Sequence, residues 1–150
     1  MKSKKDLVAP CGLDCFNCEI YEDNLTDKLA DLIHAKVGAA REEIPCKGCR
    51  QQDGVHYHLP PEGCATLNCV KAKGVELCCD CDEFPCELLG PLAEGADRYP
   101  HNMKVYNLCR IKKIGIERWI EDEAGQIRKM YFTGAFVVGN GQVEKGSATD

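Results

Sequence analysis

The chain has 150 residues, the usual size of one domain, and 12 of them are cysteines, a density typical of scaffolds cross-linked by disulfides or by metal. Its formal net charge is −5 at pH 7, and each zinc ion held by four thiolates would add two further negative charges. Because such a surface is poorly matched to phosphate backbones, the charge argues against a nucleic-acid-binding protein and favours a protein partner.

The start of the chain, MKSKKDLVAPCG, is charged and then polar, without the apolar segment of a secretory signal. No run reaches the about 18 consecutive apolar residues that cross a membrane. We therefore expect a cytoplasmic protein with no membrane segment, in which reduced thiols bind metal instead of forming disulfides. Residues 1–7 are expected to be mobile.

The first cysteine motif is Cys11, Cys15 and Cys18, spaced C-x3-C-x2-C, with Pro10 and Gly12 forming a tight turn around the first thiol. The same spacing opens the loop that holds a [4Fe–4S] cluster in radical SAM enzymes. This chain lacks the length and the strand–helix alternation of their barrel. An iron–sulfur cluster on these three cysteines therefore remains an alternative to zinc, but not as part of a radical SAM enzyme.

Apolar residues at helical spacing predict a helix over residues 25–37, with an apolar face of Leu25, Leu29, Leu32, Ile33 and Val37. Asp23 or Asn24 is expected to cap it and Gly38 to end it, with His34 on its surface.

The second motif, Cys46-Lys-Gly-Cys49, has the spacing of a zinc knuckle. A polar loop follows over residues 51–63 and carries His56 and His58. Cys64 and Cys69 come next, with a short helix expected over residues 65–73 and closed by Gly74.

The third motif contains a second C-x2-C pair, Cys78 and Cys81, with Cys79 as the odd thiol because adjacent side chains point apart. Cys86 follows, at the start of a short helix expected to run through Leu88 and Leu89.

After a loop over residues 90–101, we expect Asn102 to cap a helix that packs Cys109 on an apolar face and breaks at Gly115. Another short helix over residues 116–123 should turn Trp119 and Ile120 inward.

Strand-like residues follow at 130–132 and 135–138, with a hairpin signal at Asn140-Gly141 and a mobile end over residues 145–150. The predicted fold is thus one mainly α domain over residues 1–150, with short helices and loops stapled by metal and a small C-terminal β-hairpin.

The motifs from Ala9 to Cys86 resemble those of the domain-of-unknown-function 3795 family, small Cys-rich proteins of bacteria and archaea regarded as zinc binders. The resemblance covers about residues 8–90 and implies metal binding but no established activity. Many members have a cysteine at the position of Pro61, so one site here either lacks a thiol or uses His56 or His58.

Ten cysteines match the family pattern and are the expected metal ligands: Cys11, Cys15, Cys18, Cys46, Cys49, Cys64, Cys69, Cys78, Cys81 and Cys86. We expect about two zinc ions, because a closed site uses four thiolates. One site is expected to use Cys46, Cys49, Cys64 and Cys69. The other should use the three N-terminal cysteines and one of Cys78, Cys81 and Cys86.

Three functions remain open at this stage. The first is a zinc-stapled binding or adaptor module without catalysis, and the second an iron–sulfur redox protein. The third is an enzyme that uses the thiol of Cys79 or Cys81 beside Asp80, although an acidic neighbour raises a thiol pKa. No phosphate-binding loop, serine nucleophile motif, HExxH motif or dinucleotide fingerprint is present.

Overall fold

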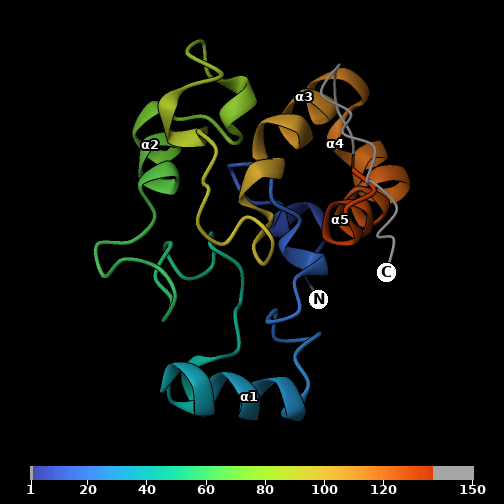
Figure 1. Cartoon of the computed structure of the whole chain (residues 1–150). Coiled ribbons are helices and arrows are strands. Elements are labelled where there is room, and N and C mark those ends of the chain that lie inside the picture. The colour runs from blue at the N-terminus through green and yellow to red at the C-terminus, as the bar shows by residue number, and fades with distance from the viewer. Residues whose placement is uncertain (1, 137–150) are drawn as a thin grey trace.

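The computed structural model describes residues 2–136, and this part of the chain is mainly helical, as predicted (Figure 1). Its α-helices are α1 (Asp27–Val37), α2 (Ala65–Lys73), α3 (Lys104–Ile114), α4 (Ile116–Arg118) and α5 (Ala124–Thr133), joined by loops and short 3₁₀ turns. The β-pairing in these residues consists of two isolated bridges, Val8 with Asp14 and Tyr21 with Cys46. The expected hairpin turn at residues 140–141 lies outside the described residues.

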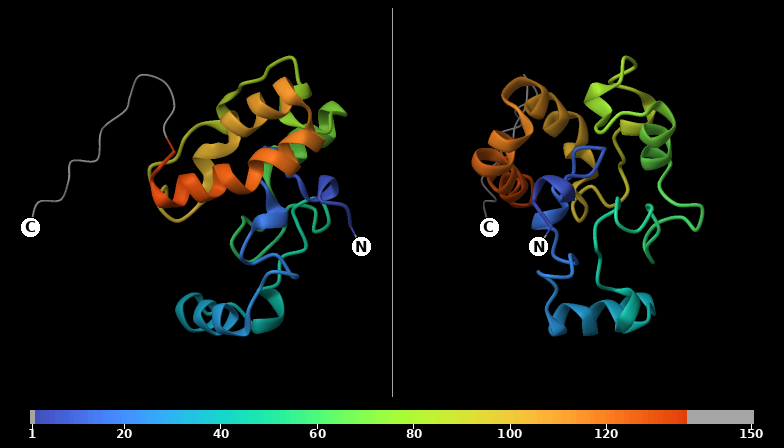
Figure 2. Two further views of the ribbon diagram at one scale, coloured as in Figure 1. Left: turned by 90° about the vertical axis from the view of Figure 1, so that its right-hand side faces the viewer. Right: turned by 180° about the vertical axis from the view of Figure 1, so that it is seen from behind.

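Helices α3 and α5 form an antiparallel hairpin and lie side by side in Figure 2. Gly115, with φ of +88°, ends α3, and α4 then continues through a π-helical turn, Trp119–Glu123, into α5. The helix expected over residues 116–123 therefore runs ten residues further, and the strand predicted at 130–132 is wrong. Ala124 and Ile127 are buried one turn apart, and this helical spacing outweighs the β-propensity of the aromatic residues after them.

Trp119 and Leu108 are fully buried at the centre of the hairpin, as predicted for Trp119, while Ile120 is half-buried. The Phe16 ring meets the Trp119 ring edge-on, with centroids 6.4 Å apart, and so packs the N-terminal loop against the helices. Cys109 is exposed, which corrects the expectation that it packs in the core. Its neighbour Leu108 takes the inward position.

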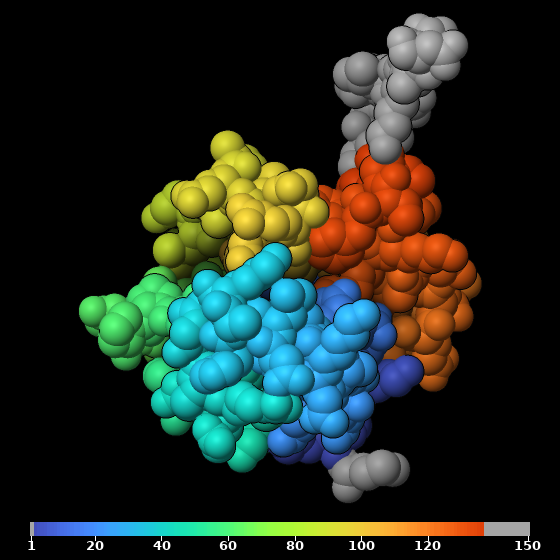
Figure 3. Space-filling model, turned by 60° about the horizontal axis from the view of Figure 1, so that its bottom comes forward, coloured from blue at the N-terminus to red at the C-terminus, as the bar shows by residue number. Residues whose placement is uncertain are grey.

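Helix α1 stands apart from the hairpin and α2 (Figures 1 and 2) and forms part of the face shown in Figure 3. Its N-cap is Thr26, whose hydroxyl accepts a hydrogen bond from the Leu29 N–H at 3.3 Å, so the cap predicted at 23 or 24 is wrong. Gly38, with φ of +77°, ends the helix as predicted. The predicted apolar face is only partly covered: Leu32 is 48% and Val37 63% exposed, while its other three residues are half-buried.

Residues 51–63 form turns only, as predicted, and α2 has the predicted bounds, with Gly74 in the left-handed conformation after it. The helix expected after Cys86 is one 3₁₀ turn, Glu87–Leu89. Asn102 does not cap α3, because its side chain bonds the N–H and the carbonyl of Leu92 at 2.9 and 3.1 Å. In place of a cap, a 3₁₀ turn, Pro100–Met103, leads directly into the helix.

None of the helices between residues 2 and 136 combines the length and the apolar composition that crossing a membrane requires.

Candidate metal centre

Four of the predicted ligands, Cys69, Cys78, Cys81 and Cys86, line one small cavity. Cys69 comes from α2, Cys78 from the 3₁₀ turn η4 (Cys78–Asp80), and the other two from the loop that follows η4. The cavity measures about 20 Å³. That is roughly the space of one water molecule, so it has room for a single small species and not for an organic substrate.

The walls of this cavity are held by backbone and ionic contacts. The Cys78 N–H donates to the Pro10 carbonyl at 2.9 Å, which fixes η4 against the N-terminal loop. Asp80 accepts a hydrogen bond from the Leu77 N–H at 3.1 Å and so closes the turn. Lys73 and Glu83, which also line the cavity, form an ion pair at 2.8 Å.

These thiols lie close enough together to affect one another. Burial raises the pKa of the Cys78 thiol to about 12, and the nearby Cys11, Cys86 and Cys69 raise it further. A neutral thiol is thus favoured in the protein alone, whereas a bound cation would reverse the preference and hold the thiolates.

A second group of thiols, Cys11, Cys15, Cys49 and Cys64, gathers where the N-terminal loop meets residues 46–64. A hydrogen bond between the Cys15 and Cys49 side chains raises the pKa of Cys15 and lowers that of Cys49. Burial raises the pKa of Cys11 to about 11; the Lys104 charge opposes this, and Cys49 and Cys64 add to it. The group therefore combines thiols of the first motif, the second motif and the Cys64–Cys69 pair.

Gly54 brings Cys49 and Cys64 together. Its N–H donates to the Cys49 carbonyl at 2.8 Å, and its φ is +71°. A Cβ at this position would lie 2.8 Å from both the Cβ and the backbone nitrogen of Cys64. Only glycine fits such a close approach with a positive φ, so the loop residue Gly54 helps to position a predicted ligand.

Cys18 and Cys46 lie beside this second group. The Cys46 N–H donates to the Ile20 carbonyl and the Cys46 carbonyl accepts from the Glu22 N–H, both at 2.8 Å, which pairs the two segments. The Gly48 N–H donates to Cys46 Sγ at 3.4 Å, a contact that favours a thiolate. Burial nevertheless raises the pKa of Cys46, and Cys18 and Cys49 add to the effect.

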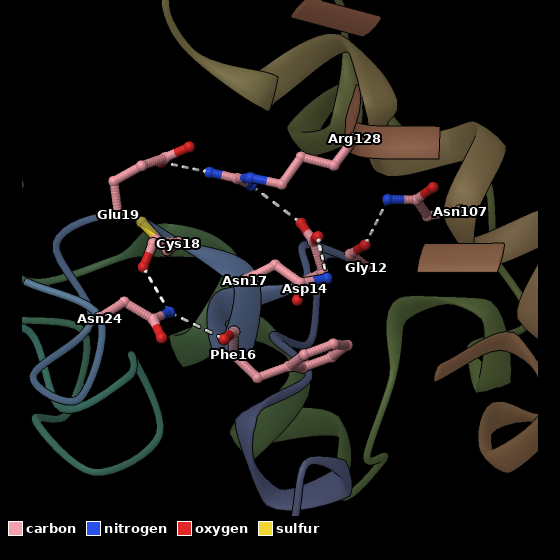
Figure 4. A network of polar contacts seen from close by, with 9 residues as sticks. All are labelled: Gly12, Asp14, Phe16, Asn17, Cys18, Glu19, Asn24, Asn107 and Arg128. Atoms are coloured by element: carbon pink, nitrogen blue, oxygen red, sulfur yellow. Dashed lines mark hydrogen bonds and ion pairs between the residues drawn. The ribbon is translucent and has the colours of Figure 1, made fainter. Parts of the chain in front are cut away.

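The helical hairpin holds the loop that carries Cys11, Cys15 and Cys18 (Figure 4). Asn107 of α3 donates to the Gly12 carbonyl at 2.9 Å. Gly12 has φ of +85°, and a Cβ there would lie 2.9 Å from the Lys104 carbonyl, so the loop turns directly on α3.

Arg128 of α5 makes the other clamp in Figure 4, donating to Asp14 at 3.0 Å and to Glu19 at 2.7 Å. Asp14 is 3% exposed. Burial raises its pKa, and the Arg128 charge opposes that shift. From the other side of the loop, Asn24 donates to the carbonyls of Phe16 and Cys18, both at 2.9 Å.

No sequence pattern pointed to Arg128, Asn107 or Asn24 as residues that position the predicted ligands. Each acts on a partner in the N-terminal loop, and for the first two that partner is 114 and 95 residues away along the chain. The sequence around a polar residue of a helix does not indicate such distant contacts, whereas the spacing of cysteines does indicate metal ligands.

His56 and His58 contact each other, with their Nδ1 atoms 2.6 Å apart, so one ring donates and the other accepts. Burial lowers the pKa of His58 to about 4, and His56 and His101 lower it further. His56 Nε2 is buried and has no hydrogen-bond partner among the described residues. Both rings are therefore neutral, the state in which histidine binds metal. His34 lies exposed on α1, as predicted.

The structure gathers the thiols differently from the expected grouping of Cys46, Cys49, Cys64 and Cys69. Cys69 lies with the third motif, while Cys49 and Cys64 lie with the N-terminal motif. Cys64 is the extended N-cap residue of α2 and Cys69 lies within the helix, so helical periodicity does not place the two thiols together.

Between residues 2 and 136, no three Cys, His, Asp or Glu side chains already converge on one point as ligands of an ion do. The donor set of four thiols around a cavity of one-water size suits a tetrahedral ion, and binding would require their side chains to rotate inward. The ligand set thus stays a prediction.

The sequence model of a family described as "Protein of unknown function (DUF3795)" matches residues 7–91, more than half of the chain. The match begins just before the first cysteine motif and ends before α3, which confirms the resemblance seen in the sequence. No curated protein and no solved structure matches the chain.

Proposed function

We propose that this chain, which belongs to the DUF3795 family, is a zinc-binding protein whose cysteines staple the loops of a binding or adaptor module. Two ions are expected, one for each group of four thiols. When bound, zinc would supply fixed links between loops that are distant in the sequence.

The observation that carries the proposal is the cavity lined by Cys69, Cys78, Cys81 and Cys86. Four thiolates at about 2.3 Å from zinc form a closed tetrahedral site, and a space of one-water size accommodates one such ion. The walls are otherwise mostly apolar, with Val75, Phe84 and Leu89 among them, so an ion would be shielded from water. A closed site has no open position for a substrate, which favours a structural ion over a catalytic one.

The second ion is assigned to Cys11, Cys15, Cys49 and Cys64. These thiols come from the N-terminal loop and from residues 46–64, so one ion here would tie the two segments together. Cys18 and Cys46 lie beside this group as reserve or shared ligands, with His56 and His58 on the adjoining loop.

The second candidate function is an iron–sulfur redox protein. It is favoured by the closeness of Cys11, Cys15 and Cys18 on one loop, where Cys11 and Cys18 contribute to the raised pKa of Cys15. Three thiolates of this motif and Cys49 as a fourth would match the ligand count of a cluster. A thiol enzyme is less well supported, because burial and then Asp80 raise the pKa of Cys79.

The test is the metal content of protein purified without oxygen, measured by elemental mass spectrometry together with the visible spectrum. We expect colourless protein with about two zinc ions per chain, since each closed site needs four thiolates. Cys81→Ser should lower this by about one ion, while the matched control Cys109→Ser, an exposed cysteine outside both groups, should retain both. Brown protein with iron and sulfide would favour the second candidate, and metal-free protein with a native fold would contradict both.

A further inference from the structure

An open cleft lies between the N-terminal loop and the start of α1. It measures about 410 Å³, within the usual size range of ligand pockets. The residues that line it are Phe16, Asn17, Glu19, Asn24, Thr26 and Leu29. No predicted metal ligand is among these six, so the cleft is a site that the zinc proposal does not use.

The polar groups that the cleft leaves free are mainly hydrogen-bond acceptors (Figure 4). Asn24 Nδ2 donates to the carbonyls of Phe16 and Cys18, both at 2.9 Å. Asn17 Nδ2 donates to the Asp14 carboxylate, also at 2.9 Å. Because carbonyls and carboxylates can only accept, these contacts fix both amides and leave their oxygens for a ligand.

Glu19 supplies the charge of the cleft, and its side chain is 63% exposed. Arg128 binds its Oε2 atom at 2.7 Å, while Oε1 has no hydrogen-bond partner among the described residues. Arg128 also pairs with the buried Asp14, so one guanidinium faces two carboxylates. This group of three therefore has a net negative charge, and Glu19 is the carboxylate that solvent reaches.

The apolar part of the cleft is formed by Phe16 and by Leu29 of α1. Leu32 follows Leu29 by three residues on the helix and is 48% exposed, so the apolar surface continues along α1. Lys4 does not line the cleft, but its Nζ lies 5.7 Å from the centroid of the Phe16 ring, which shows that a cation is compatible with this ring. A side chain with an apolar stem and a cationic end would match both parts of the cleft.

We propose that this cleft binds an arginine side chain of a protein partner. A guanidinium carries five N–H donors and a positive charge, which match the free acceptors and the carboxylate of the cleft. Its stem would lie on Phe16 and Leu29, and neighbouring residues of the partner would cover Leu32, which a small molecule would leave exposed. The inference rests on the proposed adaptor role and names the kind of partner, but it invokes neither zinc ion.

The test is an NMR titration of the full ¹⁵N-labelled chain, as purified, with the capped peptide acetyl-Gly-Arg-Gly-amide. We expect saturable shifts of the side-chain amide signals of Asn17 and Asn24. The same peptide with citrulline in place of arginine has nearly the same shape but no charge. It should bind about tenfold more weakly, because it loses a charge-assisted hydrogen bond.

Glu19→Gln removes the charge of the cleft and should weaken binding of the arginine peptide about tenfold, for the same reason. Its matched control is Glu22→Gln, which changes the net charge equally at an exposed residue outside the cleft and should bind as the parent does. Leu29→Ala is a second variant that leaves the contacts of Arg128 in place. It should weaken binding severalfold, because it removes part of the apolar wall.

Equal affinity for the arginine and citrulline peptides would overturn the inference, as would a Glu19→Gln variant that binds like the parent or a titration without saturable shifts. Tighter binding of free arginine than of the capped peptide would also overturn it, by indicating a small-molecule ligand. Metal content of the same samples judges the zinc proposal separately. Two zinc ions without peptide binding would contradict the cleft alone, and peptide binding by a folded protein without zinc would contradict the zinc proposal alone.

Discussion

The helical hairpin of α3 and α5 and the cysteine region, residues 38–90, differ in how they bury apolar side chains. In the hairpin, Leu108, Trp119 and Ile127 are buried together, so removal of apolar surface from water holds α3 and α5. Between residues 38 and 64, Ile44 is the one large apolar side chain that is buried. Residues 38–64 therefore bury less apolar surface than the hairpin, and we expect the thiols of this segment to hold it through metal, as proposed above.

The N-terminal loop connects the two regions. On one side it is held by Asn107 and Arg128 of the hairpin, and on the other it presents Cys11 and Cys15 to the thiols of residues 46–64. The hairpin thus provides a preformed surface on which half of the proposed second site is placed.

The largest effect within the hairpin should come from Trp119→Ala. Loss of a fully buried indole that contacts Phe16 should lower the free energy of unfolding by about 3–5 kcal/mol, from lost transfer energy and the cavity left behind. Chemical denaturation with the metal content held constant measures this. The matched change Leu32→Ala, on the exposed face of α1, should cost much less; equal costs would contradict the placement of the core.

Arg128→Gln should break the connection between hairpin and loop. It leaves the buried Asp14 carboxylate without its cation, and the expected loss is about 3 kcal/mol, with a further rise in the pKa of Asp14. Denaturation and a carboxyl titration by NMR measure the two effects. Arg118→Gln, in an exposed pair with Asp122, is the control and should stay within about 0.5 kcal/mol of the parent. A similar small effect at Arg128 would show that the clamp is not needed.

Gly12→Ala should have a smaller effect that is still specific to the contact between the N-terminal loop and α3. The methyl group adds a positive-φ penalty of about 1–2 kcal/mol and also a clash with the Lys104 carbonyl. Gly38→Ala separates the two contributions, because Gly38 also has a positive φ but nothing lies within 4 Å of the added Cβ. We expect Gly12→Ala to cost more than Gly38→Ala in thermal unfolding; the reverse order would contradict the close packing of the loop on α3.

Much of this structure could be predicted from local signals. Gly38 and Gly74 predicted the ends of α1 and α2, because glycine readily takes the positive φ that ends a helix. The C-x2-C spacing paired Cys78 with Cys81, and both line one cavity, although their role as ligands stays a prediction. These features depend on residues a few positions apart.

What could not be predicted depends on distance along the chain. Cys69 was expected to share an ion with Cys46, Cys49 and Cys64, but it lines a cavity with cysteines 9 to 17 positions further along the chain. Spacing does not give the order in which loops meet, and the ligand set stays a prediction. The Arg128–Asp14 contact spans 114 positions. Residues 130–132 were misread as a strand because their aromatic side chains favour β-structure locally, while the buried Ile127 one turn earlier fixes them in α5.

Hydrogen exchange measured by mass spectrometry with bound metal, and again after chelation under reducing conditions, tests the central claim most directly. We predict that residues 39–64 and 74–90 lose protection when metal is removed, while α3 and α5 keep most of theirs, since only the cysteine region is expected to depend on metal cross-links. Exchange that is unchanged throughout, or that rises equally in the hairpin and the cysteine region, would contradict the division of the molecule into a hydrophobic part and a metal-stapled part.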